Sequence, residues 1–176
     1  MYFITGNKNK LKEAQEILGS SLENTALDLL EIQGSEEEIA RHKALEAYSK
    51  VSKPVFVEDV SIKIESMDGL PGPYIKYFLE AMGAKKIAAI CSGSQAQAIC
   101  TIGYAESKDR VHIFQGVIQG RIVEPRGESG FGFDPIFEPD GYDKTFAQMS
   151  IQEKNAISHR KLAIQKLKDY VCQARA

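Results

Sequence analysis

The pattern of apolar and polar positions predicts an α/β protein that opens with a strand, a tight turn and a helix. Residues 2–5 form a short apolar run that is typical of a buried strand. Gly6 and Asn7 break this run, and apolar residues then recur at helical spacing from Leu11 to Leu18. The polar residues between them, Glu13 included, are expected on the other faces of that helix.

A second strand and helix follow. Residues 26–32 read as a strand, and Ser35 with Glu38 matches the capping box that starts a helix. That helix carries an apolar side from Ile39 to Val51, and Pro54 closes the unit. Residues 55–64 read as a strand, in which Val55, Phe56 and Val57 give an almost continuous apolar run that indicates burial on both faces.

The remaining pattern mixes helices with a long hairpin. We expect a rigid turn, two helices split at Gly83, an antiparallel hairpin, a glycine- and aromatic-rich loop and a last helix from about Ala156. The turn spans residues 69–73, and the two helices span residues 74–82 and 84–91. The two strands of the hairpin span residues 99–105 and 111–123, the loop spans residues 127–139, and the last helix runs from residue 156 onward. Strand–helix units combined with a hairpin predict a mixed sheet. We expect a single domain over residues 1–176, with the hairpin contributing to a second lobe.

Composition narrows the function classes. The chain has 176 residues, 43% hydrophobic and 26% charged, with a net charge of −2, which gives no bulk attraction to nucleic acid or anionic membrane. Cys91, Cys100 and Cys172 form no CxxC pair, so packing roles in a reducing cytoplasm are expected. No run has the length of a membrane span, and we expect no signal peptide.

The first candidate site is TGNKNK, residues 5–10, between the first strand and the first helix. Free N–H groups at a helix start and nearby lysines suit a phosphate chain, although the Walker A spacing is absent. The alternative is that Thr5 or Asn7 caps the helix and the lysines are solvated.

The second candidate is VEDVSI, residues 57–62. Glu58 and Asp59 occur in an apolar strand, and a half-buried carboxylate needs a partner such as Mg²⁺. Because side chains alternate along a strand, only one of the two is expected to reach a site, and Glu31 could add an oxygen ligand. The alternative is a carboxylate at a strand end that faces water.

The third candidate is the loop GESGFGFDPIF, residues 127–137. Its glycines allow a ligand to approach the backbone, and its phenylalanines offer faces on which a purine stacks. Asp134 precedes proline and is expected to be extended. The alternative is a structural loop whose aromatic residues belong to the core.

The fourth candidate is EKNAISHR, residues 153–160, read as a helix start. Lys154, His159 and Arg160 would add positive charge where the helix is already positive, and a bound anion would explain that. The alternative is a solvated basic surface. Lys43 and Lys76 add two further cations.

Together these features describe a site for a nucleoside triphosphate. Donor groups around the base would favour keto purines over adenine. Three other interpretations remain: a nucleotide sensor without hydrolysis, a single-strand nucleic-acid binder, and a pyrophosphatase for other modified nucleotides.

The chain resembles the inosine triphosphate pyrophosphatase family over nearly its whole length. TGNKNK, VEDVSI, GLPGPYIK, GFGFDPIF and EKNAISHR occur in the family's order. The resemblance implies a two-lobed α/β fold with a long twisted mixed sheet flanked by helices, an active site in the central cleft, and a homodimer. It also implies Mg²⁺-dependent hydrolysis of ITP, dITP and XTP to the monophosphate and pyrophosphate.

The resemblance further assigns roles to individual residues. Asp59 would orient or deprotonate water, and Glu31 and Asp59 would bind the metal. The chain departs from the family pattern at Val60 and Phe133, where a small polar residue and tryptophan are common. The implied substrate-binding residues are Thr5, Gly6, Asn7, Lys8, Asn9, Lys10, Lys43, Asp59, Val60 and Lys76 on the phosphate side, and Phe131, Gly132, Phe133, Asp134, Lys154, His159 and Arg160 around the base.

Overall fold

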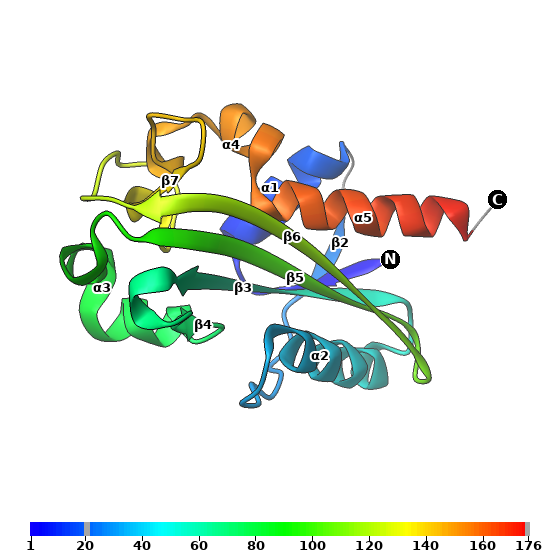
Figure 1. Cartoon of the computed structure of the whole chain (residues 1–176). Coiled ribbons are helices and arrows are strands. Elements are labelled where there is room, and N and C mark those ends of the chain that lie inside the picture. The colour runs from blue at the N-terminus through cyan, green and yellow to red at the C-terminus, as the bar shows by residue number, and fades with distance from the viewer. Residues whose placement is uncertain (20–21, 175–176) are drawn as a thin grey trace. The chain divides into compact units, whose positions relative to one another are not determined.

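The computed structural model describes residues 1–19 and 22–174 (Figure 1). The helices are α1 (Lys8–Leu18), α2 (Glu36–Val51), α3 (Ile75–Cys91), α4 (Ile151–Ile157) and α5 (His159–Gln173). The strands are β1 (Tyr2–Ile4), β2 (Glu23–Thr25), β3 (Val55–Ile64), β4 (Pro71–Gly72), β5 (Gln95–Ser107), β6 (Arg110–Ile122) and β7 (Phe137–Pro139). Three short 3₁₀ helices are η1 (Glu65–Met67), η2 (Asp134–Ile136) and η3 (Phe146–Gln148).

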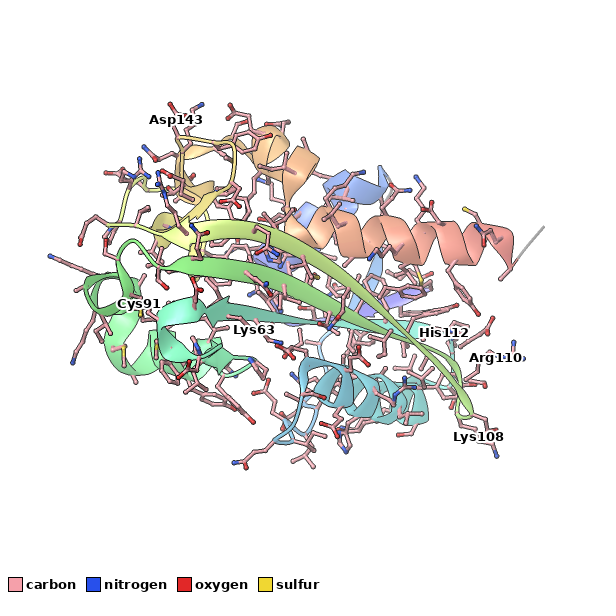
Figure 2. The ribbon with its side chains drawn as sticks, viewed as in Figure 1. Lys63, Cys91, Lys108, Arg110, His112 and Asp143 are labelled. Carbon is pink, nitrogen blue, oxygen red and sulfur yellow. The ribbon has the colours of Figure 1, made fainter. Side chains whose placement is uncertain are left out.

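The strands form one mixed sheet, which confirms the predicted α/β class. Its order is β2-β1-β3-β5-β6-β7, with β4 paired to β3 outside this path. β1 pairs with β2 and β3 in parallel, whereas β3–β4 and β6–β7 are antiparallel. Only Lys108 and Asp109 connect β5 to β6, as expected for an antiparallel hairpin. The turn carries Lys108, and Arg110 and His112 follow along β6 (Figure 2).

The described residues group into two compact units. Unit 1 comprises residues 1–59, 100–116 and the chain from 160 onward, and unit 2 comprises residues 60–99 and 117–159. The strands β3, β5 and β6 contribute residues to both units. The prediction of a single domain over residues 1–176 stays a prediction.

Unit 1 has an apolar cluster on each face of its strands. α1 and α5 cover one face, where Phe3 and Phe56 stack with ring centroids 4.4 Å apart beside Leu167. α2 covers the other face through Ala44 and Ala47 (Figure 1). In unit 1, the side chains of β3 therefore point alternately towards α1 and α5 or towards α2.

Unit 2 has its own core. Ile62 and Ile64 of β3 pack with Ile87 of α3 and with Phe137 and Phe146. The predicted break at Gly83 is present as non-helical backbone inside α3, with φ 74° and ψ 161°. No helix in the described residues is long and apolar enough to cross a membrane.

The predicted strand over residues 26–32 is wrong. The strand next to β1 is instead the short β2, residues Glu23–Thr25. Leu27 and Leu29 do turn towards the core of unit 1, which explains the apolar alternation. Side chains of α2 satisfy backbone groups of this segment, because Leu30 N–H donates to Glu46 at 2.8 Å and Lys50 donates to the Asp28 carbonyl at 2.6 Å.

The last helical region also differs from the prediction of one helix from about Ala156. Ser150 and Glu153 form a capping box that starts α4, which ends at Ile157. Ser158, with φ −65° and ψ 156°, separates α4 from α5. The stretch EKNAISHR is thus the end of one helix and the start of another.

Candidate functional site

Charged side chains gather in unit 1 on both faces of β3. Glu58 and Asp59 are adjacent in this strand and make separate sets of ion pairs, as the strand alternation predicted. Asp59 pairs with Lys43 of α2. Glu58 pairs with Arg160 of α5 and Lys10 of α1.

Lys43 bridges the two residues predicted to bind metal. Its Nζ lies 3.0 Å from Glu31 Oε1 and 3.1 Å from Asp59 Oδ1. Burial acts most strongly on the pKa of Lys43 and would lower it, but Asp59 and Glu31 together raise this pKa above its ordinary value. Lys43 therefore remains an ammonium ion at neutral pH.

Arg160 is at the centre of a second group of ion pairs. Its Nε and Nη2 donate to the two carboxylate oxygens of Glu58 at 2.8 and 2.7 Å, and its Nη1 donates to Glu13. The Arg160 side chain is 1% exposed. Burial works against its charge, yet Glu58 and Glu13 raise the pKa of Arg160 above its ordinary value.

Lys10 joins this group from the start of α1. Its Nζ lies 3.4 Å from Glu58 Oε1 and 3.2 Å from the Glu58 carbonyl oxygen. The Lys10 side chain is 17% exposed, so its ammonium group is only partly shielded from solvent. Lys10 thus links the exposed turn before α1 to the buried Glu58–Arg160 pair.

The TGNKNK segment forms the start of α1. The Asn7 side chain caps the helix by accepting from the N–H groups of Asn9 and Lys10, and Asn7 N–H donates to Thr5 Oγ1 at 3.1 Å. The alternative interpretation of this segment predicted that Thr5 or Asn7 caps the helix, and the Asn7 cap confirms that part of it. The second part of that alternative, solvated lysines, holds for Lys8, which is exposed, but not for Lys10, which pairs with Glu58.

Unit 2 contains a buried ion pair on its aromatic loop. Lys154 Nζ lies 2.6 Å from Asp134 Oδ2, and both side chains are 4% exposed. The same Asp134 oxygen accepts from Phe131 N–H at 2.8 Å. The Lys154 ammonium also lies 4.8 Å from the centre of the Phe131 ring, so it is placed for a cation–π contact.

Aromatic rings surround His159 in the same unit. The ring centroids of Phe133 and Phe146 each lie 5.9 Å from that of His159. Phe133 and His159 are both buried, whereas Phe131 is half-buried. The loop therefore combines one partly accessible ring, that of Phe131, with buried aromatic and polar side chains.

The helix-start argument for EKNAISHR is corrected by these contacts. Lys154 lies in the last turn of α4, where a cation complements the helix dipole, and Asp134 pairs with it. Arg160 lies in the first turn of α5, but two carboxylates of unit 1 neutralise it. Its positive charge has a protein partner and does not by itself require a bound anion.

The structure distributes the predicted residues over the two units. Unit 2 holds Lys76, exposed on the first turn of α3, and Val60, which packs against the unit 2 core. The substrate roles of all these residues stay predictions. Unit 1 holds two groups of predicted residues: the turn of Thr5, Gly6, Asn7, Lys8, Asn9 and Lys10, and the ion-pair group of Glu31, Lys43 and Asp59. Unit 2 holds a third group, which comprises Phe131, Gly132, Phe133, Asp134, Lys154 and His159.

Sequence reasoning missed Glu13 and left Glu58 without its partners. Glu13 was expected on a polar face of the first helix, yet it is 5% exposed and bonded to Arg160. Its position directly before the buried Ala14 was an available signal. Glu58 and Arg160 are 102 residues apart, so no local pattern links them.

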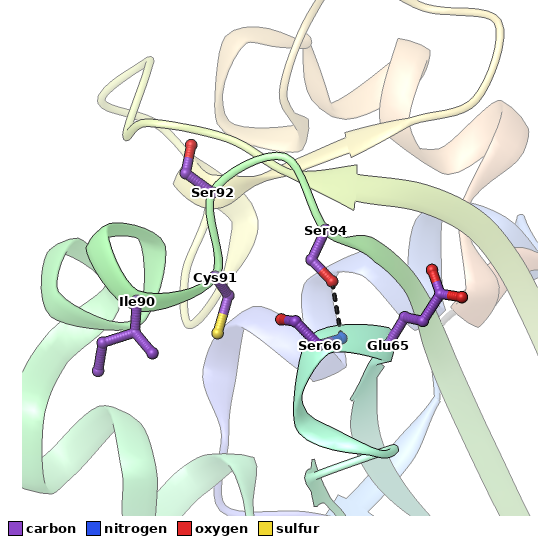
Figure 3. Close-up of a pocket in the computed structure, with 6 residues that line it drawn as sticks. All are labelled: Glu65, Ser66, Ile90, Cys91, Ser92 and Ser94. Carbon is purple, nitrogen blue, oxygen red and sulfur yellow. Dashed lines mark hydrogen bonds between the residues drawn. The ribbon is translucent and has the colours of Figure 1, made fainter.

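A separate pocket of about 420 Å³ lies in unit 2 (Figure 3). Glu65, Ser66, Cys91 and Ser94 contribute to its wall, and Ser66 N–H donates to Ser94 Oγ at 2.9 Å. None of the predicted site residues lines this pocket.

The Glu31–Asp59 pair fits a divalent cation as part of a ligand set. Within the described residues, no three His, Cys, Asp or Glu side chains gather closely enough to hold a metal by themselves. Both carboxylates nevertheless approach one cation, the Lys43 ammonium. Mg²⁺ often takes one or two carboxylates and completes its shell with water and substrate phosphates, and the Glu31–Asp59 pair has the chemistry of such ligands.

The mixed sheet and its flanking helices define an α/β protein, and lysine–carboxylate ion pairs lie on both faces of β3 in unit 1. The chain belongs to the Ham1 family, whose model matches residues 1–170.

Relatives and solved structures agree with this membership. The chain is 43% identical to an inosine triphosphate pyrophosphatase of Schizosaccharomyces pombe, over 96% of this chain and 93% of the relative. It is 45% identical to a protein of the same name from Phaeosphaeria nodorum, over 97% of this chain and 93% of that relative. A HAM1 protein structure from Coxiella burnetii matches with a TM-score of 0.85 and 30% identity, over 98% of both chains. These matches confirm the family that the sequence motifs indicated.

Proposed function

We propose that this protein is a hydrolase that converts ITP, dITP and XTP to the monophosphate and pyrophosphate with the help of Mg²⁺. The observation that carries the proposal is the convergence of Glu31 and Asp59 on a single cation, Lys43. Relatives named inosine triphosphate pyrophosphatase, similar over nearly their whole length, support the substrate class. Removal of such nucleotides would clear them from the nucleotide pool.

Asp59 is the proposed catalytic residue. Water attacks the α-phosphorus, the bond to the bridging oxygen of the β-phosphate breaks, and pyrophosphate leaves. Asp59 orients the water or accepts its proton; its carboxylate is half-buried and lies 3.1 Å from Lys43 Nζ. A bound Mg²⁺ would supply charge neutralisation on the phosphates, with Glu31 and Asp59 as its protein ligands.

The phosphates would be held by the TGNKNK turn together with Lys43 and Lys76. Lys8 is exposed and Lys10 is partly exposed, so both can meet a solvent-borne anion. Binding would require Lys10 to share its charge between Glu58 and a phosphate. The proposed phosphate-side residues are Thr5, Gly6, Asn7, Lys8, Asn9, Lys10, Lys43, Asp59, Val60 and Lys76.

The base would be held by the aromatic loop of unit 2. Phe131 offers a partly accessible ring for stacking. Lys154 is a cationic donor suited to a keto oxygen, whereas the amino group of adenine offers a donor in the equivalent position. The proposed base-side residues are Phe131, Gly132, Phe133, Asp134, Lys154, His159 and Arg160.

The cellular setting is part of the proposal. The free cysteines and ordinary composition suit a cytoplasmic protein, and the net charge of −2 gives no reason for a nucleic-acid or membrane partner. We propose a homodimer of one two-lobed domain per chain. Light scattering would test this by giving about twice the 19.5 kDa chain mass.

A panel of nucleoside triphosphates tests the reaction. Purified protein is incubated with ITP, dITP, XTP, ATP and GTP, with and without Mg²⁺, and the products are separated. Monophosphate plus pyrophosphate from ITP, dITP and XTP, lost on chelation and restored by Mg²⁺, is the expected result. Diphosphate plus phosphate would contradict the proposal, binding without turnover would support a sensor, and preference for another modified nucleotide would change the substrate class.

A further inference from the structure

The Lys43 ammonium group lies between the Glu31 and Asp59 carboxylates. Its residue is 9% exposed, and Ala40 and Ala44, on the same helix, are completely buried. The Cβ of Ala44 lies 3.1 Å from the position that a Cβ on Gly103 of β5 would take, so α2 packs closely on the sheet here. This packing holds the helix backbone from which the Lys43 side chain extends.

The Lys43 ammonium uses oxygen atoms that a metal ion would need. An ammonium group can only donate hydrogen bonds, and this one donates to Glu31 Oε1 and Asp59 Oδ1. Mg²⁺ binds oxygen at about 2.0–2.1 Å, so a metal on these two oxygens would come very close to the ammonium group. Two cations at such a distance repel each other strongly in a partly buried setting.

Charge balance shows what would relieve this repulsion. Glu31, Asp59 and Lys43 together carry one net negative charge, and a divalent ion would make the group net positive by one charge. A triphosphate chain would supply negative charge to balance it. The lysine could then turn towards a phosphate oxygen while the metal takes the carboxylates.

We propose that Lys43 acts as an internal competitor of the metal, so that tight metal binding depends on the arrival of the nucleotide. Lys43 holds the carboxylates together in the nucleotide-free protein and releases them when phosphate becomes its partner. Metal and nucleotide then strengthen each other's binding, as linkage requires. This inference rests on the proposed function and adds an order of binding to it.

Metal titration of the nucleotide-free protein tests the inference without any turnover. Mn²⁺ is the probe, and its free concentration is measured by electron paramagnetic resonance. Lys43→Met keeps the apolar stem but removes the charge, so it should bind Mn²⁺ at least about tenfold more tightly than the wild type. Glu31→Gln in the Lys43→Met background should abolish that gain.

Two further variants serve as controls, and a third replaces Lys43→Met if that variant does not fold. Lys43→Arg keeps the positive charge and should leave the Mn²⁺ affinity within about threefold of the wild type. Lys50→Met removes another lysine of α2, one that pairs with Glu46 at 2.7 Å, and should have no effect. Lys43→Gln repeats the charge removal with a polar side chain if Lys43→Met fails to fold, as judged by thermal unfolding.

The outcomes separate this inference from the proposed function. Unchanged or weaker Mn²⁺ binding in a folded, charge-removed variant would overturn the inference, even if the wild type hydrolyses ITP. Tighter binding in that variant would support it, even if the nucleotide panel identified another substrate.

Discussion

Neighbouring residues of one strand perform different tasks in unit 1. Glu58 is 8% exposed and bonds Arg160 through both of its carboxylate oxygens, whereas Asp59 is half-buried and contacts Lys43. A buried carboxylate with a bidentate arginine is suited to holding structure. A carboxylate that solvent can reach is suited to chemistry.

Asp59→Asn should separate binding from turnover. The amide keeps the size of the side chain but cannot accept a proton from water or carry a charge, so ITP hydrolysis should fall by about 10²–10⁴-fold. Nucleotide binding, measured by calorimetry, should remain detectable. A variant with turnover near that of the wild type would remove Asp59 from the catalytic role.

Glu58→Gln should destabilise the fold. The change leaves Arg160 buried with less compensating charge, which should lower the free energy of unfolding by about 3 kcal/mol in urea denaturation. Glu106→Gln is a matched control, because its partner Arg110 is 66% exposed, and it should cost less than about 1 kcal/mol. Equal effects of the two changes would show that the buried pair contributes little.

Short elements carry the aromatic loop of unit 2. Asp134 starts η2 and accepts from Phe131 N–H, while Lys154 reaches it from α4. A side chain on Gly130 would place its Cβ 2.4 Å from Asp134 Oδ2. The absence of a side chain at Gly130 therefore permits the Asp134–Lys154 pair.

Gly130→Ala should disturb this loop more than Gly132→Ala. Both glycines have a left-handed backbone, with φ 79° and 66°, so both changes should incur about 1–2 kcal/mol of strain. Only Gly130→Ala also collides with Asp134, since the nearest atom to a Cβ on Gly132 lies 3.7 Å away. Thermal unfolding of the two variants measures the difference, and equal melting temperatures would show that Asp134 adjusts freely.

The stability of the molecule as a whole should depend on pH through its buried carboxylates. Burial acts most strongly on Glu138 and would raise its pKa, but hydrogen bonds from Arg126 and Arg121 outweigh it and lower this pKa below its ordinary value of 4.5. A lowered pKa in the folded state stabilises the protein above about pH 4.5. That contribution is lost as the pH falls through the folded-state pKa.

Glu138→Gln should reveal this contribution. The variant should be less stable than the wild type at neutral pH, and the gap should narrow as the pH falls below about 4.5, because the carboxylate becomes neutral first in the unfolded and then in the folded wild type. Urea denaturation at several pH values between about 7 and 3 measures it. Glu124→Gln, which removes an exposed carboxylate, should follow the wild-type curve. A gap that stays constant with pH would rule out ionisation of Glu138 as its cause.

Several features followed from local pattern in the sequence. The first strand and helix, the capping box at Ser35, the strand from Val55 to Ile64 and the break at Gly83 all match the structure. Each depends on residues within a few positions of one another, through side-chain periodicity, capping or the backbone freedom of glycine. The order of the motifs was also sufficient to indicate the family.

Tertiary structure decided which charges meet. Lys43 comes from α2 to Asp59 of β3, and Arg160 comes from α5 to a strand about a hundred residues earlier in the chain. The segment 26–32 failed as a strand because side chains of α2 satisfy its backbone, and α4 and α5 separate at Ser158. A sequence pattern records how often a residue faces the interior. Which residue pairs with a buried charge depends on how elements distant in the sequence pack together. This packing determined the electrostatic environment of the proposed site.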